Sequence, residues 1–229
     1  MKYELKMVCY NAKVGNLFFN NIVLKTPIFM PVGTYGVIKG VDLNDINSIG
    51  FDIILCNTFH LMSKPCINAI NYNNGLHNFI NWRRCILTDS GGYQIFSLNE
   101  NIMQKDGVIF KSFDDGKIIF MTPEKSVLLQ HYFKSNVIMC LDDCVKYPFN
   151  KKLNLKSVDL SLYWLKRCLK VNNKINNLFV IIQGGTYIDY RFYFMKNLYN
   201  LNFSGYAIGG LSVGEPKKSM LKILSYVTK

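Results

Sequence analysis

The chain has 229 residues, with 27 Lys and Arg against 15 Asp and Glu, so its formal net charge at pH 7 is +12. Hydrophobic residues make up 49% and charged residues 18%, which allows a sizeable buried core and excludes a disordered chain. No stretch approaches the roughly 20 apolar residues that cross a bilayer. Glu4 and Lys6 interrupt the segment where a signal peptide would have its apolar core, so we expect a cytoplasmic protein without membrane contact.

The seven cysteines are scattered, odd in number and free of any Cys-x-x-Cys pair. This usage predicts reduced thiols, with neither a disulfide framework nor a zinc site. The positive charge comes from 23 Lys and only 4 Arg, in a chain rich in residues with AT-rich codons. The surplus is compatible with a nucleic-acid partner but does not identify one.

Short apolar runs, most of them followed by segments of helical character, recur along the chain. We predict buried strands in these runs, at residues 28–32, 53–56, 85–88, 137–141, 178–182 and 206–208. We predict helices at residues 43–49, 123–133 (with Thr122 as N-cap), 157–171, 187–199 and 217–226. Residues 108–120, with Asp114-Asp115-Gly116 at their centre, predict a β-hairpin inserted after the third unit.

The alternation of strand and helix predicts a parallel sheet, which fits either a doubly wound fold or a (β/α)8 TIM barrel. Five of the six runs are followed by polar or glycine elements: Asn57-Thr58, residues 89–92, Asp142-Asp143, residues 183–185 and Gly209-Gly210. Strand ends converge on one mouth in a barrel, whereas an open sheet gathers its site at one switch point, so we favour the barrel. A full barrel has eight units, so six units predict an incomplete one, with residues 1–229 as the N-terminal part of a single barrel domain.

Residues 88–94 are the densest candidate for a binding site. Asp89 ends a predicted strand, and Gly91 and Gly92 would let the backbone approach a ligand closely. Tyr93 offers an aromatic face for a planar ring. The alternative is structural: an Asp that caps a turn, with glycines that only relieve strain.

Three further strand ends add polar groups. Asp142 and Asp143 are neighbouring carboxylates, Gln183 is an amide beside two glycines, and Gly210 offers a backbone N–H. Each has a structural alternative, such as an ion pair with Lys or a tight turn. His60, His77 and His131 lie in separate segments and are expected to pack or cap. Together the polar groups suit a planar heterocycle with several polar edges, such as a purine.

At these residues the chain resembles the bacterial queuine tRNA-ribosyltransferases, also called tRNA-guanine transglycosylases. The resemblance is carried by residues 26–34, 57–61, 75–77, 88–94, 141–144, 183–185 and 209–216. It implies an irregular (β/α)8 barrel that exchanges guanine at the wobble position of certain tRNA anticodons for a 7-deazaguanine. Implied partners are tRNA and the free base.

The resemblance also implies roles for single residues. Asp89 would act in proton transfer and base recognition. The base pocket would comprise Asp89, Ser90, Gly91, Gly92, Tyr93, Asp142, Gln183 and Gly210, with Tyr93 as the stacking platform. Cys144 and Val213 are similar to the bacterial enzymes, which insert 7-aminomethyl-7-deazaguanine. The implied reaction is a double displacement through a covalent enzyme–tRNA intermediate, without ATP or a redox cofactor.

One part of the family pattern is not found before Lys229. The nucleophilic Asp and the zinc site, three Cys and a His, follow the segment of residues 209–216 in the family, so we expect no metal ligands in this chain. We assign the nucleophile to neither Asp142 nor Asp143. Three interpretations stay open: the N-terminal part of an active enzyme, a non-catalytic base- or tRNA-binding subunit, or a decaying gene. A homodimer, or a partner chain that supplies the remaining part, is equally possible.

Overall fold

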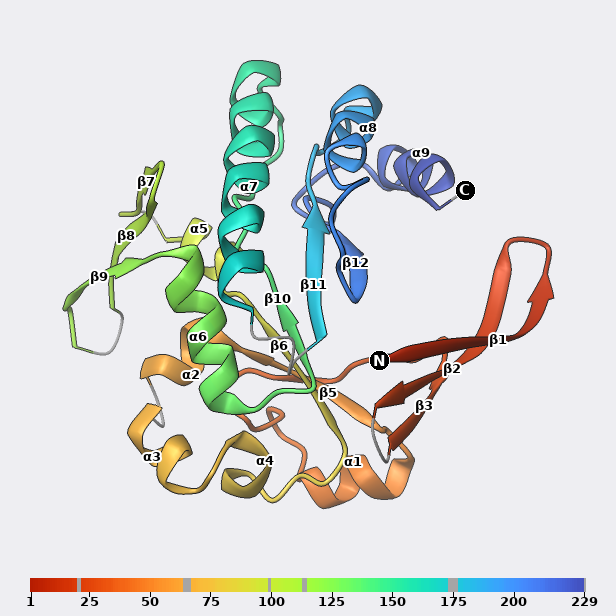
Figure 1. The fold of residues 1–229 in the computed structure, drawn as a ribbon, viewed down its shortest axis with the longest axis vertical. Helices are drawn as coiled ribbons and strands as arrows, with labels where there is room; N and C mark the ends of the chain where they lie inside the picture. Colours follow the sequence, from red (N-terminus) through yellow and green to blue (C-terminus); the bar gives the residue numbers. More distant parts are fainter. Residues whose placement is uncertain (20–21, 64–66, 99, 113–114, 173–176, 229) are drawn as a thin grey trace. The chain divides into compact units, whose positions relative to one another are not determined.

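The computed structural model describes residues 1–19, 22–63, 67–98, 100–112, 115–172 and 177–228, and its elements are labelled in Figure 1. The chain divides into two compact units. The first comprises Met1–Asp89, Leu129–Ile138 and Lys174–Asn177, and the second comprises Ser90–Leu128, Met139–Asn173 and Leu178–Lys229. No helix in the described part of the chain combines the length and apolar character needed to cross a membrane.

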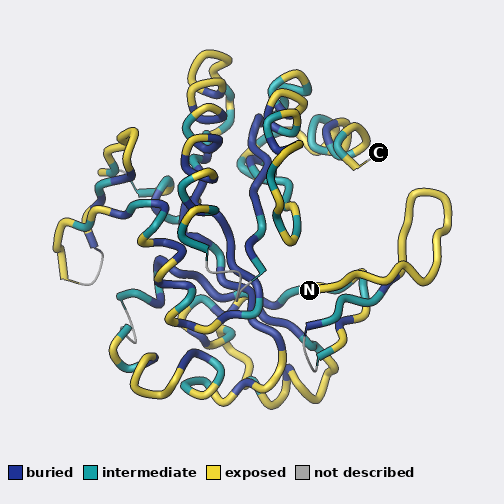
Figure 2. Tube along the Cα trace, viewed as in Figure 1, coloured by how far each residue is buried: buried dark blue, intermediate teal, exposed yellow. Residues whose placement is uncertain are grey.

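The first unit begins with an antiparallel sheet that the apolar runs did not predict. It has the order β1 (Lys2–Cys9), β2 (Ala12–Phe19) and β3 (Ile22–Thr26). Its register sets Tyr3 opposite Leu17, and Leu17 opposite Leu24, so these side chains share one face. Leu24 is buried, whereas every residue of β1 is exposed, as Figure 2 shows in yellow for this hairpin.

The same unit contains parallel strands in the order β10–β6–β5–β4, which confirms the predicted parallel sheet. Their bounds are β4 (Val32–Gly33), β5 (Ile53–Asn57), β6 (Cys85–Asp89) and β10 (Val137–Met139). Strands β5 and β6 are largely buried, in agreement with their continuous apolar sequence (Figure 2). Their register aligns Asn57 with Asp89 at the carboxyl ends of the two strands.

Two strand predictions need correction. Most of residues 28–32 is not a strand, because Pro27 and Pro31 have no N–H to donate to a ladder, and only Val32 enters β4. Residues 140 and 141 lie outside β10, which ends at Met139. The unit's helices are short: α1 (Leu43–Ile49), as predicted, α2 (Thr58–Leu61), α3 (Ile67–Tyr72) and α4 (Leu76–Phe79).

The second unit contains the parallel pair β11 (Asn177–Ile182) and β12 (Gly205–Ile208). Cys140, directly after β10, donates its N–H to Phe179 of β11 at 2.9 Å. An antiparallel sheet comprises β7 (Ile102–Gln104), β8 (Gly107–Lys111) and β9 (Ile118–Met121). Strands β8 and β9 pair as the hairpin predicted at residues 108–120, and together they extend one residue beyond that segment at each end. Asp114 of the predicted turn lies outside the described residues.

The remaining helices are α5 (Gly92–Phe96), α6 (Pro123–Phe133), α7 (Lys151–Val171), α8 (Ile188–Lys196) and α9 (Lys217–Val227). Helix α6 has the predicted bounds, and Thr122 accepts a hydrogen bond from the Lys125 N–H at 3.2 Å, as an N-cap does. Helix α7 begins six residues before the predicted start, because Asn150 caps it by accepting from the Leu153 N–H at 3.0 Å. Helix α8 ends three residues earlier than predicted, at Lys196.

Candidate active site

The segment after β6 requires glycine. Gly91 has a left-handed backbone (φ 89°), and the next residue, Gly92, begins α5. A Cβ at Gly92 would lie 2.6 Å from the backbone oxygen of Asp142 and 2.7 Å from its Oδ1, so no other residue fits without movement. The Gly92 N–H donates to Ser90 Oγ at 3.3 Å. The second unit thus holds the predicted Ser90–Gly92 segment against Asp142, while Asp89 ends β6 in the first unit.

Asp142 and Gln183 form the polar centre of this site. Gln183 Nε2 donates to Asp142 Oδ2 at 2.5 Å, and the two residues are only 8% and 3% exposed. Gly210 has φ 61°, and a Cβ there would lie 2.5 Å from Gln183 Oε1. The structure therefore brings together Gly92, Asp142, Gln183 and Gly210, which sequence reasoning had grouped; we call these four residues the strand-end cluster.

Arg191 of α8 supports the strand-end cluster, and sequence reasoning missed it. The side chain is fully buried and donates to three backbone oxygens: Ile182 at 3.0 Å, Gly185 at 2.8 Å and Gly209 at 2.8 Å. Burial lowers its pKa to about 10, although the charge of Glu215 acts to raise it, so the guanidinium stays protonated at neutral pH. The available signal was an Arg inside an aromatic helix, in a chain that has only four Arg.

Glu215 is a second supporting residue without a predicted role. Its carboxylate accepts from the backbone N–H of Ser212 at 2.6 Å and of Val213 at 2.9 Å. Burial acts to raise its pKa, but these N–H groups and the charge of Arg191 leave the pKa below its ordinary value. The ionised Glu215 therefore fixes the backbone that follows Gly210, in a loop where Ser212 has φ 60°.

Asp143 lies in a different environment from Asp142. Burial raises the pKa of the Asp143 carboxyl to about 6, while a hydrogen bond from Ser157 opposes that change. Its backbone N–H donates to Ser161 Oγ at 2.9 Å, and its backbone oxygen accepts from Ser157 Oγ at 2.7 Å. These bonds tie the acidic pair to α7. Cys144, the next residue, is buried.

Tyr93 is 48% exposed and lines a cavity of about 390 Å³. Among the described residues, its lining comprises Tyr93, Phe96, Ser97, Leu98, Lys146 and Val213, all in the second unit. Tyr93 directly follows Gly92, and Val213 lies three residues beyond Gly210. We call this space the Tyr93 cavity.

In the first unit, two buried polar residues lie at the carboxyl end of β5, where Asn57 ends the strand and Thr58 begins α2. Asn57 is 3% exposed and Thr58 is fully buried. Among the described residues, neither the Asn57 amide atoms nor the Thr58 hydroxyl has a hydrogen-bond partner. Such groups are costly when unpaired, so they are available to a polar ligand beside Asp89, with which Asn57 is in register.

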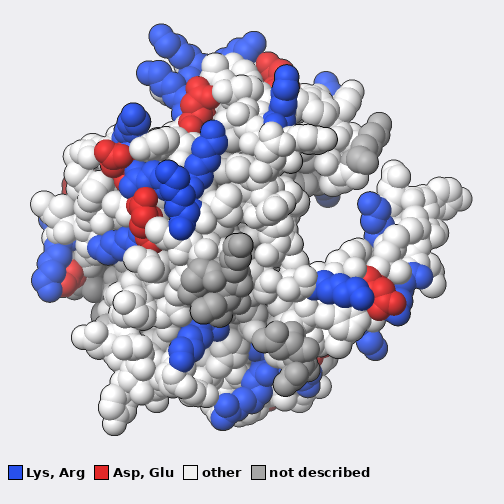
Figure 3. All heavy atoms as spheres, viewed as in Figure 1, with Lys and Arg blue, Asp and Glu red and all other residues white. Residues whose placement is uncertain are grey.

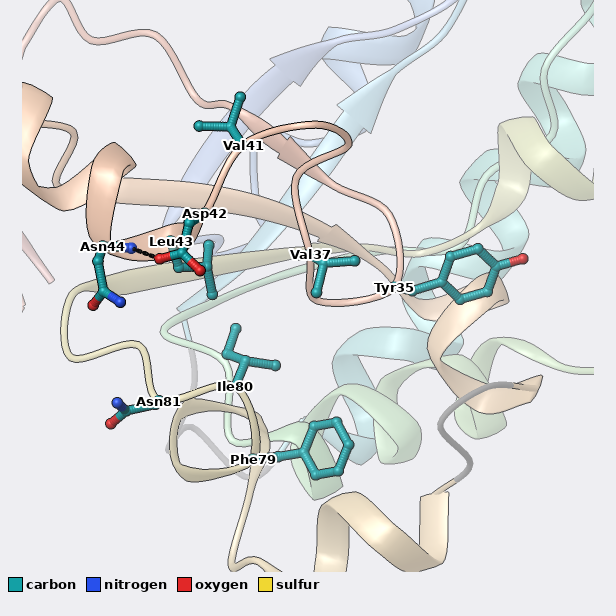
Figure 4. A pocket seen from close by; sticks show the side chains of 9 residues that line it. All are labelled: Tyr35, Val37, Val41, Asp42, Leu43, Asn44, Phe79, Ile80 and Asn81. Atoms are coloured by element: carbon teal, nitrogen blue, oxygen red, sulfur yellow. Dashed lines mark hydrogen bonds between the residues drawn. The ribbon is translucent and has the colours of Figure 1, made fainter.

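The first unit has a cavity of about 370 Å³, and none of the predicted site residues lines it (Figure 4). Asp42 in its wall caps α1 by accepting from the Asn44 N–H at 2.7 Å, drawn as a dashed line in Figure 4. Over the part of the chain that the structure describes, no three His, Cys, Asp or Glu side chains are grouped as metal ligands. The described residues therefore do not fit the zinc site that the resemblance implies.

Comparison with known proteins finds the same family that the sequence motifs resemble. The model of the family "Queuine tRNA-ribosyltransferase" matches residues 9–229. A queuine tRNA-ribosyltransferase of Acinetobacter baumannii is 47% identical over 233 residues, covering 99% of this chain and 62% of the relative. A relative of the same name from Blochmanniella pennsylvanica is 45% identical, covering 100% of this chain and 63% of its own length. The chain thus spans about three fifths of the length of these curated relatives.

Proposed function

The chain belongs to the queuine tRNA-ribosyltransferase family, and from this premise we propose that it takes part in exchanging guanine in tRNA for a 7-deazaguanine. The observation that carries the proposal is the Asp142–Gln183 pair, held between Gly92 and Gly210. A buried carboxylate accepts two hydrogen bonds, and a buried amide both donates and accepts. This set matches the N–H and C=O edges of guanine, and buried polar recognition of this kind discriminates strongly between bases.

We propose that the six βα units form part of a (β/α)8 barrel, with the β8–β9 hairpin inserted after the third unit and residues 1–229 forming the N-terminal part of that domain. The parallel strands with polar carboxyl ends support this proposal.

Within this site each residue has a distinct task. Asp142 and Gln183 bind the polar edge of the base, and the backbone at Gly210 binds a second edge. Tyr93 stacks on the ring, as an exposed aromatic face beside a polar cluster can. Asp89 exchanges a proton with the leaving or entering base, supported by the unpaired amide of Asn57 in register with it. Ser90 and Gly91 line the approach.

The proposed reaction is a double displacement. A carboxylate attacks C1′ of the ribose, the C1′–N9 bond of guanosine breaks, and guanine leaves with a proton. The deprotonated N9 of the entering base then attacks C1′ and releases the carboxylate. Asp142 has the role of base binding beside Gln183, and the backbone of its neighbour Asp143 is tied to α7, so neither is proposed as the nucleophile.

The entering base is proposed to be 7-aminomethyl-7-deazaguanine. Cys144, directly after the acidic pair, and Val213, in the loop after Gly210, support this choice, since both are similar to the bacterial pattern. Competition between this base and queuine for the purified protein tests it. A preference for queuine would contradict the choice without affecting the base site itself.

The tRNA is proposed to bind through its phosphates, with the target nucleotide turned out of its stack. Helix α7 carries six Lys and Arg but one Asp, and Figure 3 shows basic side chains gathered around it. A polyanion is the natural ligand of such a surface. We propose that the chain acts as a homodimer or together with a partner chain.

The experiment is incorporation of radiolabelled guanine into unmodified tRNA by the purified chain, alone and with a partner fragment covering the remaining two fifths of the A. baumannii relative. We expect incorporation with the fragment, and its loss in Asp89→Ala. A non-catalytic binding subunit is the second candidate. It predicts binding of base and tRNA without incorporation in either mixture. Incorporation by Asp89→Ala at the wild-type rate would contradict the role of Asp89.

A further inference from the structure

The segment that carries Asp142 lies outside the regular elements of the second unit. Strand β10 ends at Met139, and residues 140–150 form neither helix nor strand before α7 begins. Asp142 and Cys144 within this segment are nevertheless buried. Buried backbone N–H and C=O groups need hydrogen-bond partners, so a segment without its own ladder must find partners on a neighbouring element.

Two serines of α7 are the partners of Asp143. Ser157 Oγ donates to the Asp143 backbone oxygen at 2.7 Å, and Ser161 Oγ accepts from the Asp143 N–H at 2.9 Å. The serines lie four residues apart, so they project from one face of the helix, and they are only 3% and 1% exposed. Because serine is a poorer helix former than alanine, two buried serines weaken α7 unless these bonds compensate.

The bonds to Asp143 fix Asp142 through the peptide group that joins them. The Asp142 carbonyl and the Asp143 N–H lie in one plane, so the bond to Ser161 also sets the direction of that carbonyl. The Asp142 carbonyl oxygen lies 2.6 Å from the position of a Cβ on Gly92, which leaves it no free space on that side. From this backbone the Asp142 carboxylate reaches Gln183 at 2.5 Å.

The same face of α7 reaches the loop that carries Gln183. Asn154, one turn before Ser157, is only 2% exposed. A Cβ at Gly185 would lie 2.5 Å from Asn154 Nδ2, so this loop packs directly on the helix. One helix therefore contacts the segments after both β10 and β11, and it sets the spacing between Asp142 and Gln183.

We infer that Ser157 and Ser161 are positioning residues, which place the Asp142 carboxylate for recognition of the base while their own hydroxyls bond to Asp143. The inference rests on the proposed function, since it assumes that Asp142 binds the polar edge of guanine. A well-placed carboxylate accepts from the N1–H and the 2-amino group of guanine together, whereas hypoxanthine has no 2-amino group. A misplaced carboxylate should therefore lose affinity for guanine more than affinity for hypoxanthine.

The first experiment measures the affinities of the full 229-residue chain for guanine and for hypoxanthine by calorimetry. Ser157→Ala removes the donor, and Ser157→Thr keeps a hydroxyl in its place. Ser161→Ala removes the acceptor, and it provides a second alanine variant should the first disturb folding. The matched control is Ser112→Ala, because Ser112 is also buried but bonds to Asp115 in the turn after β8. Circular dichroism and urea denaturation report the fold of each variant.

We expect guanine affinity to fall about fivefold to tenfold in Ser157→Ala and in Ser161→Ala, the range for a lost hydrogen bond that orders a site. Hypoxanthine affinity should fall about twofold to threefold, so the preference for guanine decreases about threefold. Ser157→Thr should bind guanine within about twofold of the wild-type chain. Ser112→Ala should bind both bases unchanged, even where its urea midpoint falls as far. An unchanged preference in both alanine variants, or a lost preference in Ser112→Ala, would overturn the inference.

A second arm follows the position of Asp142 without any base. The side-chain amide of Gln183, which donates to Asp142, gives its own resonances in a ¹H–¹⁵N NMR spectrum. These resonances should shift and exchange faster with solvent in Ser157→Ala, and stay in place in Ser112→Ala. Unchanged Gln183 resonances in Ser157→Ala would overturn the inference. A wild-type chain that binds no guanine would contradict the proposed function, while this arm still decides whether the serines position Asp142.

Discussion

The strand-end cluster of the second unit and the antiparallel sheet β1–β2–β3 of the first place their side chains under opposite constraints. At the cluster, Asp142 and Gln183 are buried and paired, and a Cβ has no room at Gly92 or Gly210. In the sheet, every residue of β1 is exposed. Burying polar groups costs free energy, so a buried polar cluster indicates a function. Binding of the base should therefore depend on the strand-end cluster and tolerate substitutions in β1.

The largest expected effect is at Arg191. Arg191→Met would leave three backbone oxygens, of Ile182, Gly185 and Gly209, without their donor. We expect the free energy of unfolding to fall by about 3 to 5 kcal/mol, as when one partner of a buried charged network is removed. Urea denaturation measures it. Arg83→Met, at an exposed position, is the control and should cost less than about 0.5 kcal/mol. Similar losses of unfolding free energy in both variants would show that the buried hydrogen bonds of Arg191 do not stabilise the cluster more than an exposed Arg does.

The next effect concerns pH. Because burial raises the pKa of Asp143 to about 6, above the roughly 3.9 of an unfolded chain, the folded state binds this proton more tightly. Ionisation of Asp143 therefore lowers the free energy of unfolding. The loss is absent below pH about 4, grows as the pH rises to 6, and reaches about 2 to 3 kcal/mol at higher pH.

Asp143→Asn removes this cost, so its stability relative to the wild-type chain should increase from pH 4 to pH 6.5 and then stay level. Denaturation curves at several pH values measure the difference. Two proteins whose stabilities stay parallel over this range would show that the Asp143 carboxyl is not held in a desolvating site.

A smaller effect is expected at Gly92. Gly92→Ala puts a methyl group 2.6 to 2.7 Å from Asp142, whose displacement should weaken guanine binding about tenfold, with a stability loss of about 1 to 3 kcal/mol. Gly33→Ala is the control, because its nearest neighbours lie at an ordinary 3.7 Å. Calorimetry reports the affinity of each. Unchanged affinity in Gly92→Ala would mean that Asp142 does not contact the base.

The smallest effect is expected in β1. Leu5 is half exposed, so Leu5→Thr, which keeps a branched side chain suited to a strand, should change the free energy of unfolding by less than about 0.5 kcal/mol. Guanine affinity should not change. A loss above 1.5 kcal/mol would show that this face is covered in solution.

The sequence predicted those parts of the molecule whose side-chain pattern reports burial directly. Strands β5 and β6 are continuous apolar runs buried on both faces, and α6 has a cap at Thr122. Continuous apolar runs do not predict the sheet at the N-terminus, because β1 alternates Lys and Glu with Tyr, Leu and Met, a pattern typical of a strand with one polar face. The first turns of α7 were missed because polar Asn154 lies on its buried face.

The candidate site likewise contains residues that the sequence predicted and residues that it did not. Asp142, Gln183 and Gly210 could be grouped because each follows a predicted parallel strand, and such ends share one edge. Arg191 and Glu215 could not be predicted, because they bond to backbone atoms of Gly185, Gly209 and Ser212. Every residue has such backbone atoms, so residue type does not indicate these bonds. The sequence indicated Asn57 only as part of a motif. That its buried amide has no hydrogen-bond partner among the described residues could be found only from the structure.

The most direct test is a calorimetric titration of guanine into the purified chain and into Asp142→Ala. The central claim is that the strand-end cluster recognises a purine edge. It predicts saturable one-to-one binding by the wild-type chain and a loss of about 30-fold or more in the variant, which retains its fold by circular dichroism. This corresponds to about 2 kcal/mol, the size expected when one charged partner is removed. Equal affinities in the two proteins, or no binding by a folded wild-type chain, would contradict it.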